Sequence, residues 1–341
     1  MRAAYYTRTG AARDVLEVGD VEEPRLGPGQ VKVKVAYSGV NPGETKSRGD
    51  AFGYGMGGAS RVIAGKDGAG IVVSVADNVD QARLGERVWI WGANTQLSGT
   101  AAEYVIVDAL RALPLPDSVS FEQGAAAGIP GMTAHQAVCD GRPNSDRVVL
   151  VFGAAGAVGL TAVQLAVADG AKVIGVVRRS DDHEYLLGEL GDQISIIDTE
   201  TIEDLSTAIR ELAPSGVDHV IDVDFASNIA VASDVLAGHG VISAYSTSQP
   251  SPQIPFWPLV FSSATIRFIQ GVDDIDPHIG LERATEITRA MATGNLRFPI
   301  AEILPLRDIA LAHEQVERPS KRGKVLLQVA DDKHFLPQLD L

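Results

Sequence analysis

The hydrophobic positions of the chain follow two different periodicities, one before and one after about residue 120. In the first part, short segments alternate polar and apolar residues, as half-buried β-strands do. Turns rich in glycine and proline separate these segments, for example at residues 26–29 (LGPG) and 41–43 (NPG). The pattern predicts a barrel-like β domain with strands at residues 30–36, 70–75, 87–91 and 102–107.

The second part alternates strands with helices. Residues 120–123 (SFEQ) have capping-box spacing and open an alanine-rich helix over 124–139. The continuous apolar run 148–152 is typical of a strand buried on both faces, and a glycine-rich turn leads from it to a helix over 158–169. This repetition predicts a doubly wound parallel sheet. The remaining expected elements are strands at 172–177, 194–197, 217–223, 240–244, 266–270 and 324–329, and a helix near 307–317.

Composition narrows the class of protein. A chain of 341 residues exceeds what one hydrophobic core usually supports, so two domains are expected. A net charge of −15 disfavours nucleic acid and anionic membranes as partners. No apolar run approaches the roughly 20 residues that span a bilayer, and no signal-peptide core follows the N-terminus, so a cytoplasmic location is expected. The single cysteine, Cys139, excludes an intrachain disulfide, and we expect it to be buried.

The turn after the strand at 148–152 has the sequence GAAGAVG (residues 153–159). It keeps part of the dinucleotide fingerprint, because Ala154 replaces one glycine while Gly156 and Gly159 remain. Gly156 would let the backbone approach a pyrophosphate, and Gly159 would let the helix pack on the sheet. The alternative is a purely structural corner. The expected cofactor contacts are Ala155, Gly156, Ala157 and Val158 at the start of the helix.

The end of the next strand bears on the choice of dinucleotide. NAD-binding proteins usually place an acidic residue there to accept from the ribose hydroxyl, but this chain has Val177. Arg178, Arg179 and Ser180 follow at once, and two guanidiniums with a hydroxyl suit a 2′-phosphate. The sequence therefore predicts NADPH, against the alternative of a solvated basic loop.

Six segments, taken together, resemble the zinc-independent quinone oxidoreductases of the medium-chain dehydrogenase/reductase type, which include the zeta-crystallins. They are residues 39–49 (GVNPGETKSRG), 67–70 (DGAG), 86–89 (ERVW), 122–134 (EQGAAAGIPGMTA), 149–159 (VLVFGAAGAVG) and 321–327 (KRGKVLL). The resemblance implies a split GroES-like β-barrel catalytic domain over 1–124 and 267–341, and a Rossmann domain over 125–266. It also implies a cofactor in the interdomain cleft and a homodimer.

Zinc-dependent alcohol dehydrogenases share this fold, so the resemblance raises the question of a metal. Their first catalytic cysteine would fall near Val40 and Asn41, and their His-Glu pair falls at Lys66 and Asp67. Asparagine and lysine there cannot build the Cys/His site that catalytic zinc requires, and the structural four-cysteine lobe is absent. We therefore expect no metal ligands.

The resemblance also implies roles for individual residues. Asn41 would lie beside the nicotinamide as a catalytic and cofactor-binding residue, and Thr133 would contact the nicotinamide-side phosphate or ribose. A family tyrosine often overlooks the substrate pocket, and the count leaves Tyr54 and Phe52 as alternatives. Tyr54 is equally compatible with an exposed loop position. The remaining implied cofactor contacts are Ser243, Tyr245, Phe268 and Gln270, which would hold the carboxamide, and Arg322, which would reach a phosphate.

These observations favour an NADPH-dependent reductase that passes hydride to a quinone or to an activated α,β-unsaturated carbonyl compound, without zinc. The proton would come from solvent or from Tyr54. The alternative is an NADPH-binding protein with a structural or sensing role and little turnover. The sequence does not distinguish quinone from enone reduction.

Overall fold

A computed structural model describes residues 1–51, 53–94, 96, 98–139, 141–142, 144–269, 271–272, 275–318 and 322–330. The chain forms two compact units, the first comprising Met1–Met132 with the chain from Val272 onward, and the second Thr133–Gly271. The limits expected at 124/125 and 266/267 lie a few residues earlier. One division falls inside the helix α3 (Phe121–Val138), because its first half packs with the first unit while Ala134 and Ala137 join the core of the second.

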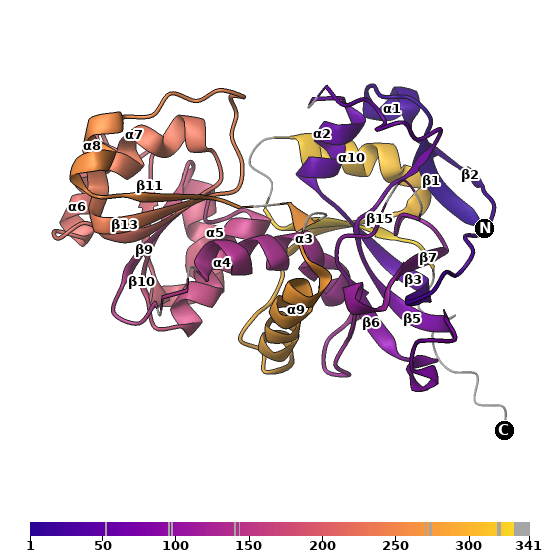
Figure 1. Ribbon diagram of the computed structural model, residues 1–341. Coiled ribbons are helices and arrows are strands. Elements are labelled where there is room, and N and C mark those ends of the chain that lie inside the picture. The colour runs from indigo at the N-terminus through magenta and orange to yellow at the C-terminus, as the bar shows by residue number, and fades with distance from the viewer. Residues whose placement is uncertain are drawn as a thin grey trace. The chain divides into compact units, whose positions relative to one another are not determined.

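The second unit, the Rossmann unit, contains a six-stranded parallel sheet in the order β11-β10-β9-β12-β13-β14 (Figure 1). Successive strands are added outward on one side of β9 and then on the other, so the strand order reverses between β9 and β12. Doubly wound sheets bind ligands at this point, at the carboxyl ends of the strands. The strands are β9 (Val148–Phe152), β10 (Lys172–Val177), β11 (Ser195–Asp198), β12 (Val217–Asp222), β13 (Leu236–Ala244) and β14 (Thr265–Phe268).

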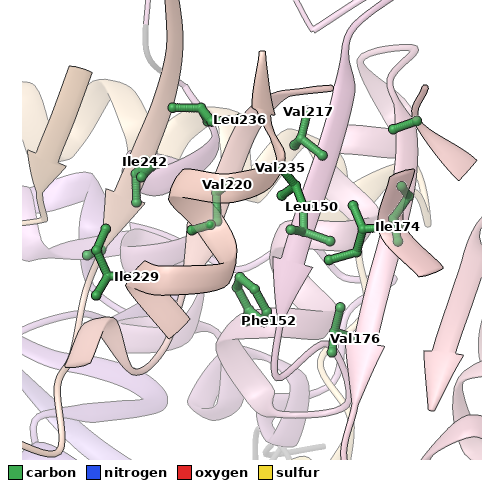
Figure 2. Close-up of a cluster of buried hydrophobic side chains, with 14 of the residues drawn as sticks. Leu150, Phe152, Ile174, Val176, Val217, Val220, Ile229, Val235, Leu236 and Ile242 are labelled. Carbon is green, nitrogen blue, oxygen red and sulfur yellow. The ribbon is translucent and has the colours of Figure 1, made fainter. Parts of the chain in front are cut away.

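Both faces of this sheet are buried, which explains the continuous apolar runs of its strands. Leu150 and Phe152 pack with helices on one face, as Figure 2 shows, while Val149 and Val151 belong to a separate core on the other. Helices α6 (Leu205–Leu212), α7 (Phe225–Val235) and α8 (Phe256–Phe261) contribute to the first core, and α4 (Ala157–Ala168) and α5 (Ser180–Leu190) to the second.

The first unit, the barrel unit, is built on a seven-stranded sheet. Its longest strand, β3 (Gln30–Val40), pairs with β5 (Asp67–Val75), β7 (Tyr104–Asp108) and the C-terminal strand β16 (Lys324–Gln328). The C-terminal segment therefore returns to the N-terminal domain, as the resemblance implies. The other strands are β1 (Arg2–Tyr6), β2 (Glu17–Asp20), β4 (Val62–Ile63), β6 (Arg87–Ile90), β8 (Ala112–Pro114) and β15 (Ile300–Pro305).

Besides the first half of α3, the described residues of this unit form the α-helices α1 (Ala12–Val15), α2 (Pro42–Arg48), α9 (Pro277–Ala292) and α10 (Ile309–Glu317). The predicted strands and helices of both units recur with ends shifted by a few residues at most, apart from β3 and β13, which are longer than expected. The expectation for Cys139 is wrong, because this residue is exposed just beyond the end of α3. Over the described part of the chain, no helix combines the length and apolar character that crossing a bilayer requires.

Candidate functional site

The glycine-rich turn joins β9 to α4, as the fingerprint requires. A Cβ atom on Gly159 would overlap the carbonyl oxygen of Gly153, so the packing of α4 on the sheet demands glycine there. Among the described residues, a Cβ on Gly156 would meet only that same oxygen within 4 Å, at 3.3 Å. Packing thus explains Gly159 fully but leaves most of the space beside Gly156 open. This difference favours a ligand at the turn over a structural corner.

The first turn of α4 supplies the groups that such a ligand would contact. Gly156 is the N-cap residue, with φ −77° and ψ 164°, and Ala157 and Val158 follow it half-buried, while Ala155 is buried. The first N–H groups of a helix have no partner within the helix, and the dipole makes this end positive. Phosphate oxygens fit both properties.

The basic loop after β10 is less uniformly positive than its sequence indicates. Arg178 is exposed, whereas Arg179 approaches Asp182 at 3.5 Å. The Ser180 hydroxyl donates to Asp198 Oδ2 at 2.6 Å. This hydrogen bond is the main cause of a lowered pKa of Asp198, despite partial desolvation. A carboxylate from the end of β11 thus lies beside the residues expected to bind the 2′-phosphate.

The carboxyl ends of β13 and β14 hold the other predicted contacts of the Rossmann unit. Ser243 is fully buried, and its hydroxyl bonds His219 Nε2 at 2.9 Å and accepts from Arg267 at 3.1 Å. Its side chain is thus committed to the sheet, and its backbone lies in register with Ile221 of β12 and Arg267 of β14. Tyr245 is half-buried, and burial and Asp222 raise its pKa. Phe268 is 72% exposed, Thr133 is half-buried in α3, and Gln270 lies outside the described residues.

In the barrel unit, Asn41 lies in a buried polar cluster with Glu44, Asp67 and Lys324. Its side-chain amide donates to Glu44 Oε2 and to Asp67 Oδ2, each at 2.8 Å, and its Oδ1 accepts from the Lys324 ammonium. Lys324 also donates to Asp67 Oδ2 at 2.7 Å. An asparagine amide has two N–H donors, and both are used here. Asn41 can therefore accept from a ligand but has no side-chain donor left for one.

Glu44 completes a capping box on α2 and connects the cluster to the neighbouring loop. It accepts from the Asn41 backbone N–H at 3.0 Å and from the Gly65 N–H at 2.9 Å. Burial, with a further contribution from Asp67, raises the pKa of Glu44 to about 7, although its hydrogen bond from Asn41 and the charges of Lys324 and Lys66 oppose the shift. The cluster holds two carboxyl groups and one ammonium, so it can bind an additional proton near neutral pH.

Glycines close the walls around this cluster. A Cβ on Gly128 would overlap the Asp67 carboxyl group, and one on Gly39 would crowd Lys324 Cε at 2.7 Å. The second oxygen of Asp67, Oδ1, is buried, and no described residue hydrogen-bonds to it. The cluster is thus sealed on the side of α3, although one carboxyl oxygen stays unsatisfied.

Two cavities lie in the barrel unit near this cluster. The smaller, of about 200 Å³, is lined by Tyr6, Glu44, Tyr54 and His313, and the larger, of about 690 Å³, by Asn94 and Arg111 among others. Lys66 and Gln96 line both. Tyr54 is 81% exposed, on the outer wall of the smaller cavity, while the alternative Phe52 lies outside the described residues.

Comparison with known proteins agrees with this architecture. Residues 27–117 match the family described as alcohol dehydrogenase GroES-like domain, and residues 157–279 match the zinc-binding dehydrogenase family. The human quinone oxidoreductase is 27% identical over 334 residues, covering 96% of this chain and 97% of that protein. The chain belongs to the quinone oxidoreductase family of the medium-chain dehydrogenases/reductases.

Solved structures of this superfamily extend the comparison. A mycobacterial protein complexed with NADPH has a TM-score of 0.83 and 25% identity, covering 96% of this chain and all of that one. An NAD-dependent alcohol dehydrogenase has a TM-score of 0.85 and 25% identity, covering 97% of this chain and all of that one. The two-domain fold, with a GroES-like unit and a Rossmann unit, is confirmed.

Membership of the oxidoreductase family makes the residues at the expected zinc positions informative. Lys66 is an ammonium donor, and Asn41 and Asp67 hydrogen-bond to Lys324 and to each other. Among the residues that the structure describes, no group of three or more His, Cys, Asp or Glu side chains is arranged to hold a metal ion. The donor set present at these positions does not fit the four-coordinate zinc site of the metal-dependent relatives.

Sequence reasoning missed most of the barrel site. Glu44 stands three residues after Asn41, and this capping-box spacing could have identified it. Lys324 is 283 residues from Asn41 along the chain, and no local sequence pattern predicts their contact. Arg322 precedes β16 and is half-buried in the barrel unit.

Proposed function

We propose that this member of the quinone oxidoreductase family is an NADPH-dependent reductase acting on a quinone or an activated α,β-unsaturated carbonyl compound. The observation that carries the proposal is the phosphate turn, where packing requires Gly159 but leaves open space at Gly156 beside the N-terminus of α4. The solved relative complexed with NADPH supports the choice of cofactor.

Each of the predicted site residues has a distinct role in this proposal. Ala157 and Val158 bind the pyrophosphate through backbone N–H groups, while Gly156, whose N–H donates to the Gly153 carbonyl, leaves room for it. Arg178 binds the 2′-phosphate, helped by Arg179. Backbone groups at Ser243, Tyr245 and Phe268 orient the carboxamide, together with Gln270, while Thr133 and Arg322 contact ribose or phosphate. When bound, NADPH supplies the hydride. The barrel unit holds the acceptor beside Asn41 and Tyr54 and limits the access of water.

A zinc-independent reaction is part of the proposal. Its support is the donor set at positions 41, 66 and 67, where an ammonium replaces a ligand and both acceptors are hydrogen-bonded to Lys324. Elemental analysis of the purified protein should find no stoichiometric zinc, and turnover should persist in chelator. One zinc per chain, with turnover lost on its removal, would contradict this part.

A second function, NADPH binding with little turnover, is favoured by one observation. The side-chain donors of Asn41 are already used, and Tyr54 is largely exposed, so neither predicted catalytic side chain is set up as a donor in the structure. Steady-state oxidation of NADPH with a panel of quinones and enones decides between the two functions. Tight NADPH binding without acceptor-dependent oxidation would establish the second.

The proposal includes a cytoplasmic homodimer. The helix α8 and the edge strand β14 carry exposed aromatic side chains, with Phe256, Trp257, Phe261 and Phe268 each at least 60% exposed. Exposed aromatic side chains on a surface helix and on an edge strand are typical of an association site. Sedimentation should give a dimer, and Trp257→Asp should shift it to monomer. A monomeric wild type would contradict the assembly but not the activity.

A further inference from the structure

Lys66 has a backbone that is held on both sides. The preceding N–H, of Gly65, donates to Glu44 Oε1 at 2.9 Å, and the carbonyl of Lys66 accepts from the Ala93 N–H at 2.9 Å. Asp67, which follows, is tied to Asn41 and Lys324. A side chain that starts from such a backbone has a well-defined origin, which is what a catalytic group requires.

Lys66 immediately precedes β5, next to Asp67 of the buried cluster. Because neighbouring residues of an extended segment alternate in direction, we infer that its side chain points away from that of Asp67 and toward the cavities that Lys66 lines. Lys66 is half-buried and lines both the 200 Å³ and the 690 Å³ cavities. It thus connects the smaller cavity, which Glu44 also lines, with the larger one.

The charges around the smaller cavity make Lys66 its source of positive charge. Among the described residues that line it, His313 is kept neutral because burial, with help from Arg48, lowers its pKa to about 3. Burial and Glu44 raise the pKa of Tyr6, so its hydroxyl keeps its proton. Glu44 is the acidic member, and Lys66 lowers its pKa.

We propose that Lys66 is a catalytic residue that donates a proton to the carbonyl oxygen of the acceptor in the smaller cavity. This role rests on the proposed reductase function. When a carbon of the acceptor receives hydride, the π electrons of its conjugated carbonyl move to oxygen. That oxygen forms an O–H bond with a proton from Lys66 Nζ, and the N–H electron pair stays on nitrogen. The neutral amine then takes a proton from water.

The cavity also limits the class of acceptor. Pockets for drug-sized ligands usually measure roughly 300 to 1,000 Å³, and the smaller cavity measures about 200 Å³. The acceptor inserted there is a monocyclic quinone or a short enone, with one carbonyl oxygen at Lys66. Larger ring systems require the neighbouring cavity, which Lys66 also lines.

The kinetic test compares Lys66→Met, which removes the charge and the proton, with Lys66→Arg, which keeps the charge but holds its proton too tightly to donate it. General acids contribute roughly 100-fold to 10,000-fold. Lys66→Met should therefore lower kcat at least about 100-fold with an unchanged Kd for NADPH, and Lys66→Arg should recover little of the loss. The matched control is Lys172→Met at the exposed start of β10, which should behave as wild type.

A second measurement reads the charge of Lys66 without cofactor or turnover. Bound p-nitrophenol resembles a reduced quinone anion, and its phenolate absorbs visible light. An ammonium beside its oxygen lowers its pKa, so wild type and Lys66→Arg should shift the titration to lower pH, and Lys66→Met should not. An identical titration in all three proteins, with kcat of Lys66→Met within threefold of wild type, would overturn the proposal.

Failure of the proposed function would look different. In that case the wild type would oxidise NADPH with none of the quinones or enones tested. The nitrophenol titration would still show whether Lys66 faces a ligand in the cavity, and a titration independent of Lys66 would overturn its role by itself.

Discussion

The phosphate turn of the Rossmann unit and the buried polar cluster of the barrel unit use polar groups in opposite ways. The turn leaves space at Gly156 and offers backbone N–H groups to a ligand. The cluster uses both Asn41 donors, the Asp67 Oδ2 acceptor and the Lys324 ammonium internally. Backbone donors that lack a partner within the helix indicate where a ligand binds. Side-chain donors that are already hydrogen-bonded within the protein indicate which contacts stabilise the barrel unit.

The two regions also differ in how the chain encodes them. The turn is made of consecutive residues, 153–159, whereas the cluster joins β3, α2, β5 and β16. A change in the turn should therefore affect binding and spare the fold. A change in the cluster should affect the fold first.

The largest effect is expected for Lys324→Met, which leaves two buried carboxyl groups without their cation. Removing one partner of a buried ion pair costs about 3 to 5 kcal/mol, and we expect this loss in the free energy of unfolding, measured in urea. The control Lys172→Met, at an exposed position, should change stability by less than about 0.5 kcal/mol. A loss below about 1 kcal/mol in Lys324→Met would show that the cluster does not depend on its ammonium.

Glu44→Gln should change how stability depends on pH. The pKa of Glu44 is about 7 in the folded protein and 4.5 in the reference state, so the folded state binds more protons between these values. Glu44 therefore makes the wild type less stable as pH rises from about 5 to 8, by about 3 kcal/mol at most. Glu44→Gln has no such proton to lose, so it should gain on the wild type by that amount over this range.

Unfolding free energies of both proteins at pH 5 and pH 8 provide the measurement. Taking the difference between the two proteins cancels the contributions of the other acids. A constant difference at the two pH values would mean that the hydrogen bonds to Glu44 keep it ionised throughout.

Gly156→Val tests whether the turn binds the pyrophosphate. The branched side chain would occupy the space proposed for the pyrophosphate, so NADPH affinity should fall at least about 100-fold, which corresponds to about 2.7 kcal/mol. Fluorescence titration measures the affinity, and circular dichroism checks that the protein folds. Unchanged affinity would mean that the turn is a structural corner.

Arg178→Asp should lower the preference for NADPH over NADH. A well-made charge-assisted hydrogen bond contributes roughly 1.5 to 3 kcal/mol, so we expect a preference of about tenfold to 100-fold in the wild type. The measurement is kcat/KM for both cofactors with one acceptor. Because Arg179 shares the loop, the Arg178→Asp, Arg179→Ala double variant serves as the complete test. Selectivity that survives in the double variant would show that this loop does not choose the cofactor.

The smallest effect is expected for Asp198→Asn. The change keeps an acceptor for the Ser180 hydroxyl but removes a negative charge from beside the expected 2′-phosphate. Exposed charge pairs contribute about 0.2 to 1 kcal/mol, so the preference for NADPH should rise by about 1.4-fold to fivefold. No change in the ratio of kcat/KM values would place the phosphate away from β11.

The fold was largely predictable because its signals are local. The apolar run at Val148–Phe152 predicts a strand buried on both faces, and the structure places cores on both sides of it. The strand β8 was not predicted, because its three residues are too few to show a periodicity. The strand β3 ends later than predicted, because its pairing with β16 extends it to Val40.

The site was predictable only in part. The turn at 153–159 was predictable, because one short segment contains the glycine spacing that dinucleotide binding requires. The roles of Glu44, Lys66 and Lys324 depend on where burial and pairing bring distant residues, and no single segment contains that information. Asn41 was selected from the sequence, but nothing there indicated that both of its side-chain donors bond to Glu44 and Asp67.

The late position of Lys324 in the chain has a consequence for biosynthesis. Lys324 follows Asp67 by 257 residues, which at about 5 to 20 residues per second separates their synthesis by roughly 13 to 51 seconds. All six strands of the Rossmann sheet are complete before Lys324 is made. During this time the nascent barrel unit lacks β16, and Glu44 and Asp67 lack the ammonium of Lys324. In the growing chain, the Rossmann unit can therefore fold before the barrel unit is complete, although the barrel unit begins first in the sequence.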